Sequence, residues 1–121
     1  MTKTVLTVDD SRTMREMLLI TLTDAGYKVI QAVDGQDGLE ALTAHGADVV
    51  ITDINMPRLD GFGFIEEMRA DPQHRATPIL VLTTESDAAK KARARDAGAT
   101  GWIVKPFDPV KLVDAVRRVA A

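Results

Sequence analysis

The stretch VVITD at residues 49–53 decides the fold, because a short apolar run ends there in a carboxylate, Asp53. Segments that are apolar on both faces are typical of strands buried inside a parallel sheet. A second run of this kind, ILVL at residues 79–82, ends at Thr83. The two runs predict central strands of a sheet that is covered by helices on both faces.

The segments around these two runs alternate regularly between strand and helix patterns. Further strands are expected at residues 5–8, 27–32 and 102–104. Helices are expected to begin at capping residues and to end near glycines; the markers are Ser11, Asp34 and Asp108 as caps, and Gly26, Gly46 and Gly98 as ends. The alternation predicts an α/β fold of the flavodoxin-like (βα)5 type, with a doubly wound parallel five-stranded sheet in strand order 2-1-3-4-5.

For two of the helices, the sequence predicts further details. A period of 3.6 residues predicts the buried face of the first helix, made of Met14, Met17, Leu18 and Leu22. The fourth helix is polar and is expected from about Ser86.

Length and composition exclude several classes of protein. The sequence has 121 residues, no cysteine and a net charge of −3, which predicts a single domain over residues 1–121 without disulfides or thiolate metal sites. The negative net charge argues against broad nucleic-acid binding. No apolar run approaches the roughly 20 residues that span a bilayer, and no signal-peptide pattern begins the chain. We therefore expect a cytoplasmic protein that binds neither nucleic acid nor membrane.

Polar residues follow four of the predicted strands, at the edge where parallel sheets place their functional crevice. They are Asp9 and Asp10, then Asp53, then Thr83 and Thr84, and finally Lys105. Each motif alone has a structural explanation, such as a helix cap, a strand end or a solvated lysine. Their common position at one sheet edge favours a shared site instead.

The chemistry of these residues points to phosphoryl transfer onto a carboxylate. Clustered carboxylates repel one another, and their all-oxygen character suits a hard cation such as Mg²⁺. Lys105 and Thr83 can grip phosphate oxygens, helped by backbone N–H groups of Ile54, Asn55 and Thr84. We therefore predict Asp53 as the nucleophile and Asp10, with Asp9, as metal ligands.

The chain resembles the response regulator receiver family, and in particular its CheY-like single-domain chemotaxis regulators. The likeness spans essentially all 121 residues and rests on a set of short motifs: Val8-Asp9-Asp10-Ser11, Asp53-Ile54-Asn55-Met56-Pro57, Asp60-Gly61, Thr83 and Lys105-Pro106-Phe107.

The resemblance implies roles for the residues of these motifs. Asp53 would be phosphorylated by the phosphohistidine of a sensor histidine kinase, or by a small donor such as acetyl phosphate. Mg²⁺ would be held by Asp10, Asp53 and the backbone carbonyl of Asn55, with Asp9 bound through water. Thr83 and Lys105 would contact the phosphoryl group. The Lys105–Pro106 peptide bond would be cis.

The same resemblance implies how a signal leaves the site. Thr83 would move toward the phosphoryl group, and Trp102 would turn inward from solvent, remodelling the face made by the fourth helix, fifth strand and fifth helix. Asn55 and Glu85 match the chemotaxis regulators and suggest a short-lived acyl phosphate. The basic residues Lys90 and Lys91, with Arg93 and Arg95, form either a solvated face or a docking surface for an acidic partner.

Several functions fit parts of this sequence pattern. The first choice is a monomeric chemotaxis regulator that binds the flagellar motor switch protein, and the alternative is a stand-alone phosphorelay intermediate or phosphate sink. A more remote alternative is a Mg²⁺-dependent aspartyl-phosphate phosphohydrolase, but Asn55 stands where that class needs a second aspartate. A flavodoxin-like electron carrier is disfavoured because Asp9 and Asp10 would repel a flavin phosphate. A degenerate receiver used as a scaffold would be expected to lack Asp53, Thr83 or Lys105.

Overall fold

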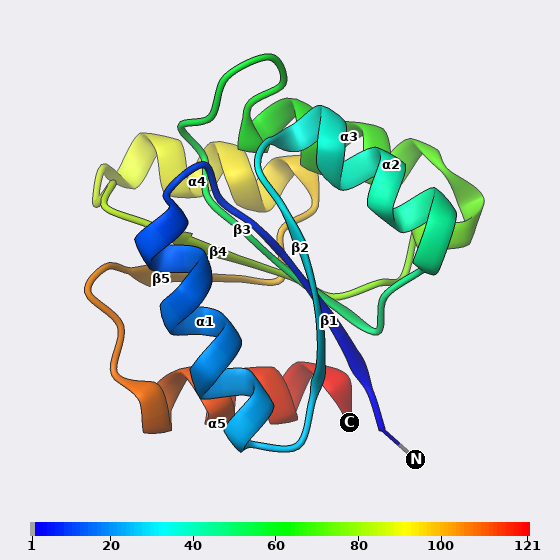
Figure 1. The fold of residues 1–121 in the computed structure, drawn as a ribbon. Helices are drawn as coiled ribbons and strands as arrows, with labels where there is room; N and C mark the ends of the chain where they lie inside the picture. The colour runs from blue at the N-terminus through cyan, green and yellow to red at the C-terminus, as the bar shows by residue number, and fades with distance from the viewer. Residues whose placement is uncertain (1) are drawn as a thin grey trace.

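The computed structural model describes residues 2–121 as a five-stranded parallel sheet with helices on both faces (Figure 1). The strands are β1 (Thr4–Val8), β2 (Lys28–Ala32), β3 (Val49–Thr52), β4 (Ile79–Thr83) and β5 (Gly101–Val104). The helices are α1 (Arg12–Asp24), α2 (Gly35–His45), α3 (Gly61–Ala70), the short 3₁₀ helix η1 (Pro72–His74), α4 (Ala88–Ala97) and α5 (Pro109–Ala120). The strand order is β2-β1-β3-β4-β5, which confirms the predicted fold class and topology.

Two separate apolar cores hold the layers together. On one face, α2, α3 and α4 pack on the sheet through a cluster that includes Leu6, Phe64 and Met68, none of which is exposed. On the other face, α1 and α5 pack through Leu22 and Val116. Figure 1 shows these two layers above and below the sheet. Strands β3 and β4 are buried along their whole length, as expected for strands that are apolar on both faces.

Helix α1 differs from its predicted burial pattern at one position. Leu18 and Leu22 are buried, whereas Met17 is 45% exposed. Successive helical residues are turned by about 100° from one another, so a helix that directs Leu18 at the sheet turns Met17 toward its flank. The prediction that Met17 is a core residue is therefore wrong.

Helix α4 begins later than predicted, at Ala88 rather than about Ser86. The carboxylate of Asp87 accepts a hydrogen bond from the N–H of Ala89 and so caps the helix. The predicted caps of α1, α2 and α5 are confirmed; these are Ser11, Asp34 and Asp108. Within residues 2–121, none of the helices has the length and apolarity needed to cross a membrane.

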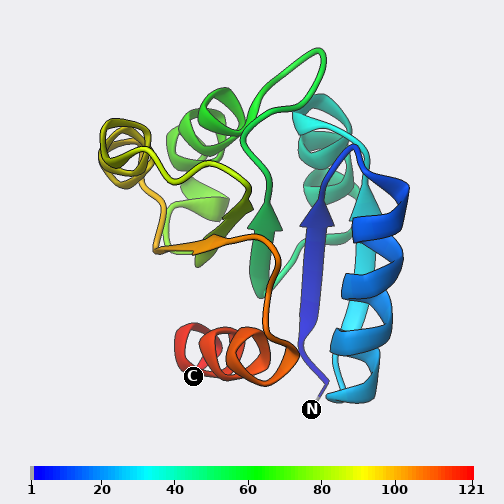
Figure 2. The same cartoon turned by 90° about the vertical axis from the view of Figure 1, so that its left-hand side faces the viewer.

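The parallel strands bring their carboxyl ends to one edge of the sheet. Figure 2 shows β1 and β3 side by side and pointing the same way, with the loop between β3 and α3 projecting beyond them. The backbone pairing places Val8 opposite Thr52 and Thr52 opposite Val81. The residues that follow these strands therefore share one end of the molecule.

Candidate functional site

Three side chains from three different strand ends meet at this edge. The ammonium of Lys105, after β5, donates to Oδ2 of Asp9 at 2.8 Å and to Oδ2 of Asp53 at 2.9 Å. Asp9 follows β1 and Asp53 follows β3. The side chains of Lys105 and Asp53 are each 11% exposed, and that of Asp9 is 2% exposed. A single positive charge thus lies between two nearly buried negative charges.

A third carboxylate completes the cluster. Asp10 lies at the surface, and one oxygen from each of Asp9, Asp10 and Asp53 lies within 4.8 Å of the other two. None of the hydrogen bonds formed within residues 2–121 is accepted by the Asp10 carboxylate. The predicted convergence of these side chains on one place is therefore observed.

Burial and charge act in opposite directions on these groups. Desolvation raises the pKa of Asp9 above its usual 3.8, although hydrogen bonds from Lys105 and Ser11 oppose the rise. Desolvation also opposes the charge on Lys105, but its hydrogen bonds to Asp9 and Asp53 outweigh that effect and raise the pKa of the ammonium. Lys105 therefore stays protonated, yet it compensates the buried acidic charge only in part.

The donor set fits a divalent cation. Three carboxylates against one ammonium leave two negative charges in excess, and every available ligand atom is oxygen. Oxygen-only sites that keep part of their surface open to water suit Mg²⁺. Asp10 is exposed and can face such an ion.

Hydrogen bonds from Ile54 and Gly61 fix the segment that contains Asp53. The N–H of Ile54 donates to Oδ1 of Asp53 at 2.6 Å, which fixes the carboxylate and leaves Oδ2 to Lys105. The N–H of Gly61 donates to the carbonyl of Ile54 at 2.8 Å. A Cβ atom at Gly61 would lie 2.3 Å from the carbonyl oxygen of Asp53, so only glycine fits there.

Thr83, Thr84 and Glu85 lie at the end of β4, which neighbours β3 on the side away from β1. Thr83 is fully buried, and its hydroxyl accepts from the N–H of Glu85 at 3.3 Å. Thr84 is exposed. The Oε1 atom of Glu85 accepts from the Nδ2 of Asn55 at 3.3 Å and pairs with the ammonium of Lys90 at 3.1 Å. Glu85 therefore joins the β3–α3 loop to the first turns of α4.

Trp102 is partly buried in this structure. The sequence analysis expected its side chain to lie in solvent before phosphorylation. Its indole N–H donates to the carbonyl of Glu85 at 3.2 Å. The ring also packs against the core beneath α4. The indole is thus already held against the residue that follows Thr83 and Thr84.

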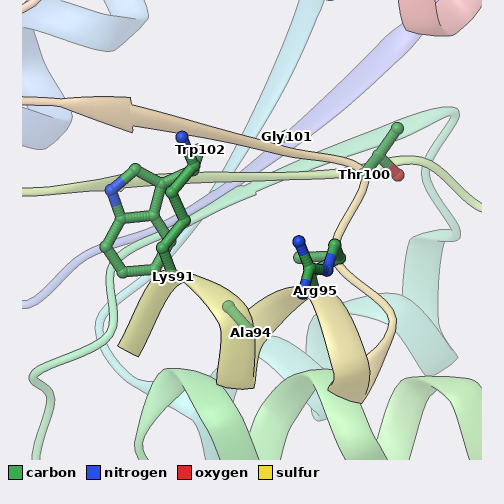
Figure 3. A pocket seen from close by; sticks show the side chains of 7 residues that line it. Lys91, Ala94, Arg95, Thr100, Gly101 and Trp102 are labelled. Atoms are coloured by element: carbon green, nitrogen blue, oxygen red, sulfur yellow. The ribbon is translucent and has the colours of Figure 1, made fainter. Parts of the chain in front are cut away.

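The four basic residues of α4 divide into two pairs with different surroundings. Lys90 pairs with Glu85, and the guanidinium of Arg93 lies 4.0 Å from the ring centre of Phe62. Lys91 and Arg95 instead line a pocket of about 110 Å³ between α4 and β5, beside Trp102 (Figure 3). Arg95 also pairs with Asp96 at 3.8 Å, so three of the four cations have partners within the fold. The solvated face and the docking surface for an acidic partner stay alternative predictions.

Two contacts at this edge lie outside the sequence prediction. Arg15 donates to the backbone carbonyl of Asp9 at 2.8 Å. Arg58 forms two hydrogen bonds with Asp34. The first contact joins residues six positions apart, across the turn from β1 into α1. The second joins segments that only the folded sheet brings together, so no local pattern reveals it. The Lys105–Pro106 peptide bond is cis, as the resemblance implies.

Comparisons with known proteins give a consistent result. Residues 5–117 match the family model described as "Response regulator receiver domain". Among curated proteins, the chemotaxis protein CheY1 of Helicobacter pylori is 39% identical over 117 residues, covering 95% of this chain and 94% of the relative. The probable transcriptional regulator ycf27 of Guillardia theta is 40% identical over 115 residues, covering 95% of this chain. The chain spans only 44% of the length of that second relative.

Solved structures agree with this assignment of the fold. The chemotaxis protein CheY4 of Vibrio cholerae superimposes with a TM-score of 0.94 at 45% identity, covering 98% of this chain and 99% of the other. The receiver domain of a sensor histidine kinase from Pseudomonas aeruginosa superimposes with a TM-score of 0.91 at 25% identity, covering 99% and 98% of the two chains. That receiver domain was solved with a magnesium ion coordinated in its active site cleft.

Proposed function

This chain belongs to the response regulator receiver family of two-component signalling systems, and we propose that it is a switch phosphorylated on Asp53. The observation that carries the proposal is the position of that carboxylate, which ends a fully buried central strand and is held by the N–H of Ile54 and the ammonium of Lys105. Residues 1–121 act as one receiver domain, as a monomer in the cytoplasm.

The reaction transfers a phosphoryl group from the phosphohistidine of a sensor kinase. A carboxylate oxygen of Asp53 attacks phosphorus, the new O–P bond forms as the P–N bond breaks, and the histidine nitrogen leaves with the electron pair. Lys105 stabilises charge on the phosphoryl oxygens, with the Thr83 hydroxyl and the backbone N–H groups of Asn55 and Thr84 as further donors. The chain thereby catalyses its own phosphorylation and dephosphorylation, and it turns over no separate substrate.

The cofactor of this reaction is Mg²⁺, which supplies positive charge to the transferring phosphoryl group. Asp10, Asp53 and the backbone carbonyl of Asn55 would hold the ion, with Asp9 bound through water. The acidic cluster supports this assignment, and so does the magnesium reported for the Pseudomonas aeruginosa receiver domain.

The output is a change at the face formed by α4, β5 and α5. Phosphorylation draws Thr83 toward the phosphoryl group, which alters the packing of Trp102 and the pocket that it shares with Lys91 and Arg95. We propose an acidic segment of the flagellar motor switch protein as the target. The similarity to chemotaxis proteins of nearly the same length supports this choice.

Substitution of Asp53 tests the phosphorylation site directly. Asp53→Asn is expected to abolish labelling by a phosphohistidine donor, because the amide is not a nucleophile of comparable strength. Asp24→Asn is a matched control, since it makes the same change at an exposed carboxylate at the end of α1, outside the cluster. Labelling of the Asp53→Asn protein that persists at a stoichiometric level would refute the assignment.

A binding experiment separates the chemotaxis function from the phosphorelay alternative. Beryllofluoride, a phosphoryl mimic, is expected to strengthen capture of the chain by the amino-terminal segment of the motor switch protein. Equal capture with and without the mimic would count against the motor target. Transfer of the phosphoryl group onward to a second histidine protein would favour a relay or sink.

A further inference from the structure

The loop between β3 and α3 is fastened to the start of α2 by an arginine that the proposed reaction does not use. Nε of Arg58 donates to Oδ2 of Asp34 at 2.7 Å, and Nη2 donates to Oδ1 at 3.1 Å. This two-pronged geometry is the strong form of an arginine–carboxylate pair. The Asp34 side chain is only 5% exposed, and it also caps α2 by accepting from the N–H of Asp37.

The backbone next to this pair makes a second contact between the same segments. The N–H of Gly35 donates to the carbonyl of Leu59 at 3.0 Å. A Cβ atom at Gly35 would lie 2.5 Å from that carbonyl oxygen, so the approach requires glycine. Arg58 itself has φ of 64°, in the left-handed region that non-glycine residues rarely adopt. The residue that bonds to Asp34 thus also holds a locally unfavourable backbone conformation.

The far end of the loop is equally restrained. Gly61 bonds to the carbonyl of Ile54, and Asp60 caps α3 by accepting from the N–H of Gly63. Between these fixed points the loop presents Asn55, whose carbonyl is a proposed metal ligand and whose side chain contacts Glu85. Figure 2 shows this loop projecting past the end of β3.

We propose that Arg58 is a positioning residue for the magnesium site, an inference that rests on the proposed function. By fastening the segment of Arg58 and Leu59 to the start of α2, it holds the loop that carries Asn55 in one conformation before the ion arrives. Without the clamp, the loop samples other conformations, and ion binding must restore the ordered one at a cost in affinity. Residues that support metal ligands from outside typically change metal affinity by about 10–100-fold when lost.

Magnesium binding measured by isothermal titration calorimetry tests this role. Arg58→Met is expected to weaken MgCl₂ binding by about tenfold, at a temperature where circular dichroism shows the protein folded. Arg58→Lys should recover part of the loss, because lysine keeps the charge but not the two-pronged geometry. Arg75→Met removes the same charge from an exposed site after η1 and should leave binding within about twofold of the unchanged chain.

A double-variant cycle makes the test independent of any single substitution. Asp34→Asn keeps a capping oxygen for α2 but loses the charge that Arg58 pairs with, so it should also weaken binding. The double variant should bind no more weakly than the weaker single variant, because both substitutions break one contact. Phosphorylation by acetyl phosphate should need more Mg²⁺ for half-maximal rate, with a nearly unchanged rate at saturation.

The outcomes separate this inference from the proposed function. Failure of the unchanged chain to bind Mg²⁺, or binding that survives Asp10→Asn and Asp53→Asn, would overturn both. Binding by the unchanged chain that Arg58→Met and Asp34→Asn leave the same would overturn only the role of Arg58. Additive losses in the double variant would also contradict a shared clamp.

Discussion

The ammonium of Lys105 sits between two carboxylates that are almost inaccessible to water. Removing one member of a buried charged group leaves the others uncompensated, which costs far more than losing a surface ion pair. Asp9 and Asp53 would then repel each other with only backbone donors to offset their charges. The stability of the ion-free protein should therefore depend strongly on this lysine.

Lys105→Met tests that dependence. The free energy of unfolding in metal-free buffer near neutral pH should fall by about 1–3 kcal/mol, because two buried acceptors lose a charged donor. Chemical denaturation followed by circular dichroism measures the change. Lys111→Met is the control, since that lysine is exposed on α5. An equal effect of the two substitutions would contradict the argument.

The pH dependence of the same variant follows from the raised pKa of Asp9. A carboxyl group with a folded pKa above its unfolded value of 3.8 favours folding when protonated. That contribution is fully present below the unfolded value and is lost as pH rises through the folded value. The destabilisation caused by Lys105→Met should therefore shrink as pH falls toward about 4. Loss that stays constant across this range would argue against carboxylate repulsion as its cause.

Thr7 is a second residue whose substitution should change the free energy of unfolding. Its side chain is fully buried in β1, and its hydroxyl has no hydrogen-bond partner among residues 2–121. Thr7→Val should raise the free energy of unfolding by about 1 kcal/mol, because it replaces an unsatisfied hydroxyl with a methyl group of similar size. The buried Thr52 is the matched control, since its hydroxyl donates to the carbonyl of Asp53 at 2.8 Å. Thr52→Val should instead destabilise the protein.

Among the five α-helices, α4 has the weakest apolar attachment. Ala94 is its only fully buried residue. Polar contacts hold it instead, and Arg69 of α3 provides the strongest of them. Nε and Nη2 of this guanidinium donate to the carbonyl of Gly98 at 3.0 and 2.8 Å, at the end of α4. Desolvation lowers the pKa of Arg69.

Arg69→Met should therefore loosen α4 more than the rest of the fold. Amide hydrogen exchange is expected to increase first in the last turn of α4, because the carbonyl of Gly98, which directly follows that turn, loses its charged donor. The free energy of unfolding should fall by about 1.5–3 kcal/mol, the range for hydrogen bonds to charged groups. Uniform exchange across all helices would show that Arg69 supports the whole fold and not this element in particular.

The success of the sequence prediction differs between elements for physical reasons. The strands β3 and β4, with their flanking caps and glycines, were predictable because burial on both faces and helix capping leave local signals. The meeting of Asp9, Asp53 and Lys105 was predictable because parallel strands end together. The partners of Lys90 and Arg93 were not, since Glu85 and Phe62 reach them through side-chain directions that only the packed helices determine.

For the molecule as a whole, ion binding and folding should be linked. A ligand that binds only the folded chain adds RT ln(1 + [L]/Kd) to the free energy of unfolding, or about 2.7 kcal/mol at one hundred times Kd. MgCl₂ should thus raise the denaturation midpoint, and NaCl at equal ionic strength should not. Asp10→Asn should remove the effect. A rise that persists in that variant would place the ion elsewhere.

The first and last segments of the described chain lie together, away from the edge that carries the acidic cluster. Lys3 precedes β1, and its ammonium donates to the carbonyl of Ala120 at the end of α5. Figure 1 shows both termini on the same side of the molecule. A fluorescent reporter, affinity tag or second folded unit fused at either terminus would therefore emerge at the end of the sheet opposite the acidic cluster and leave the approach of a kinase unobstructed.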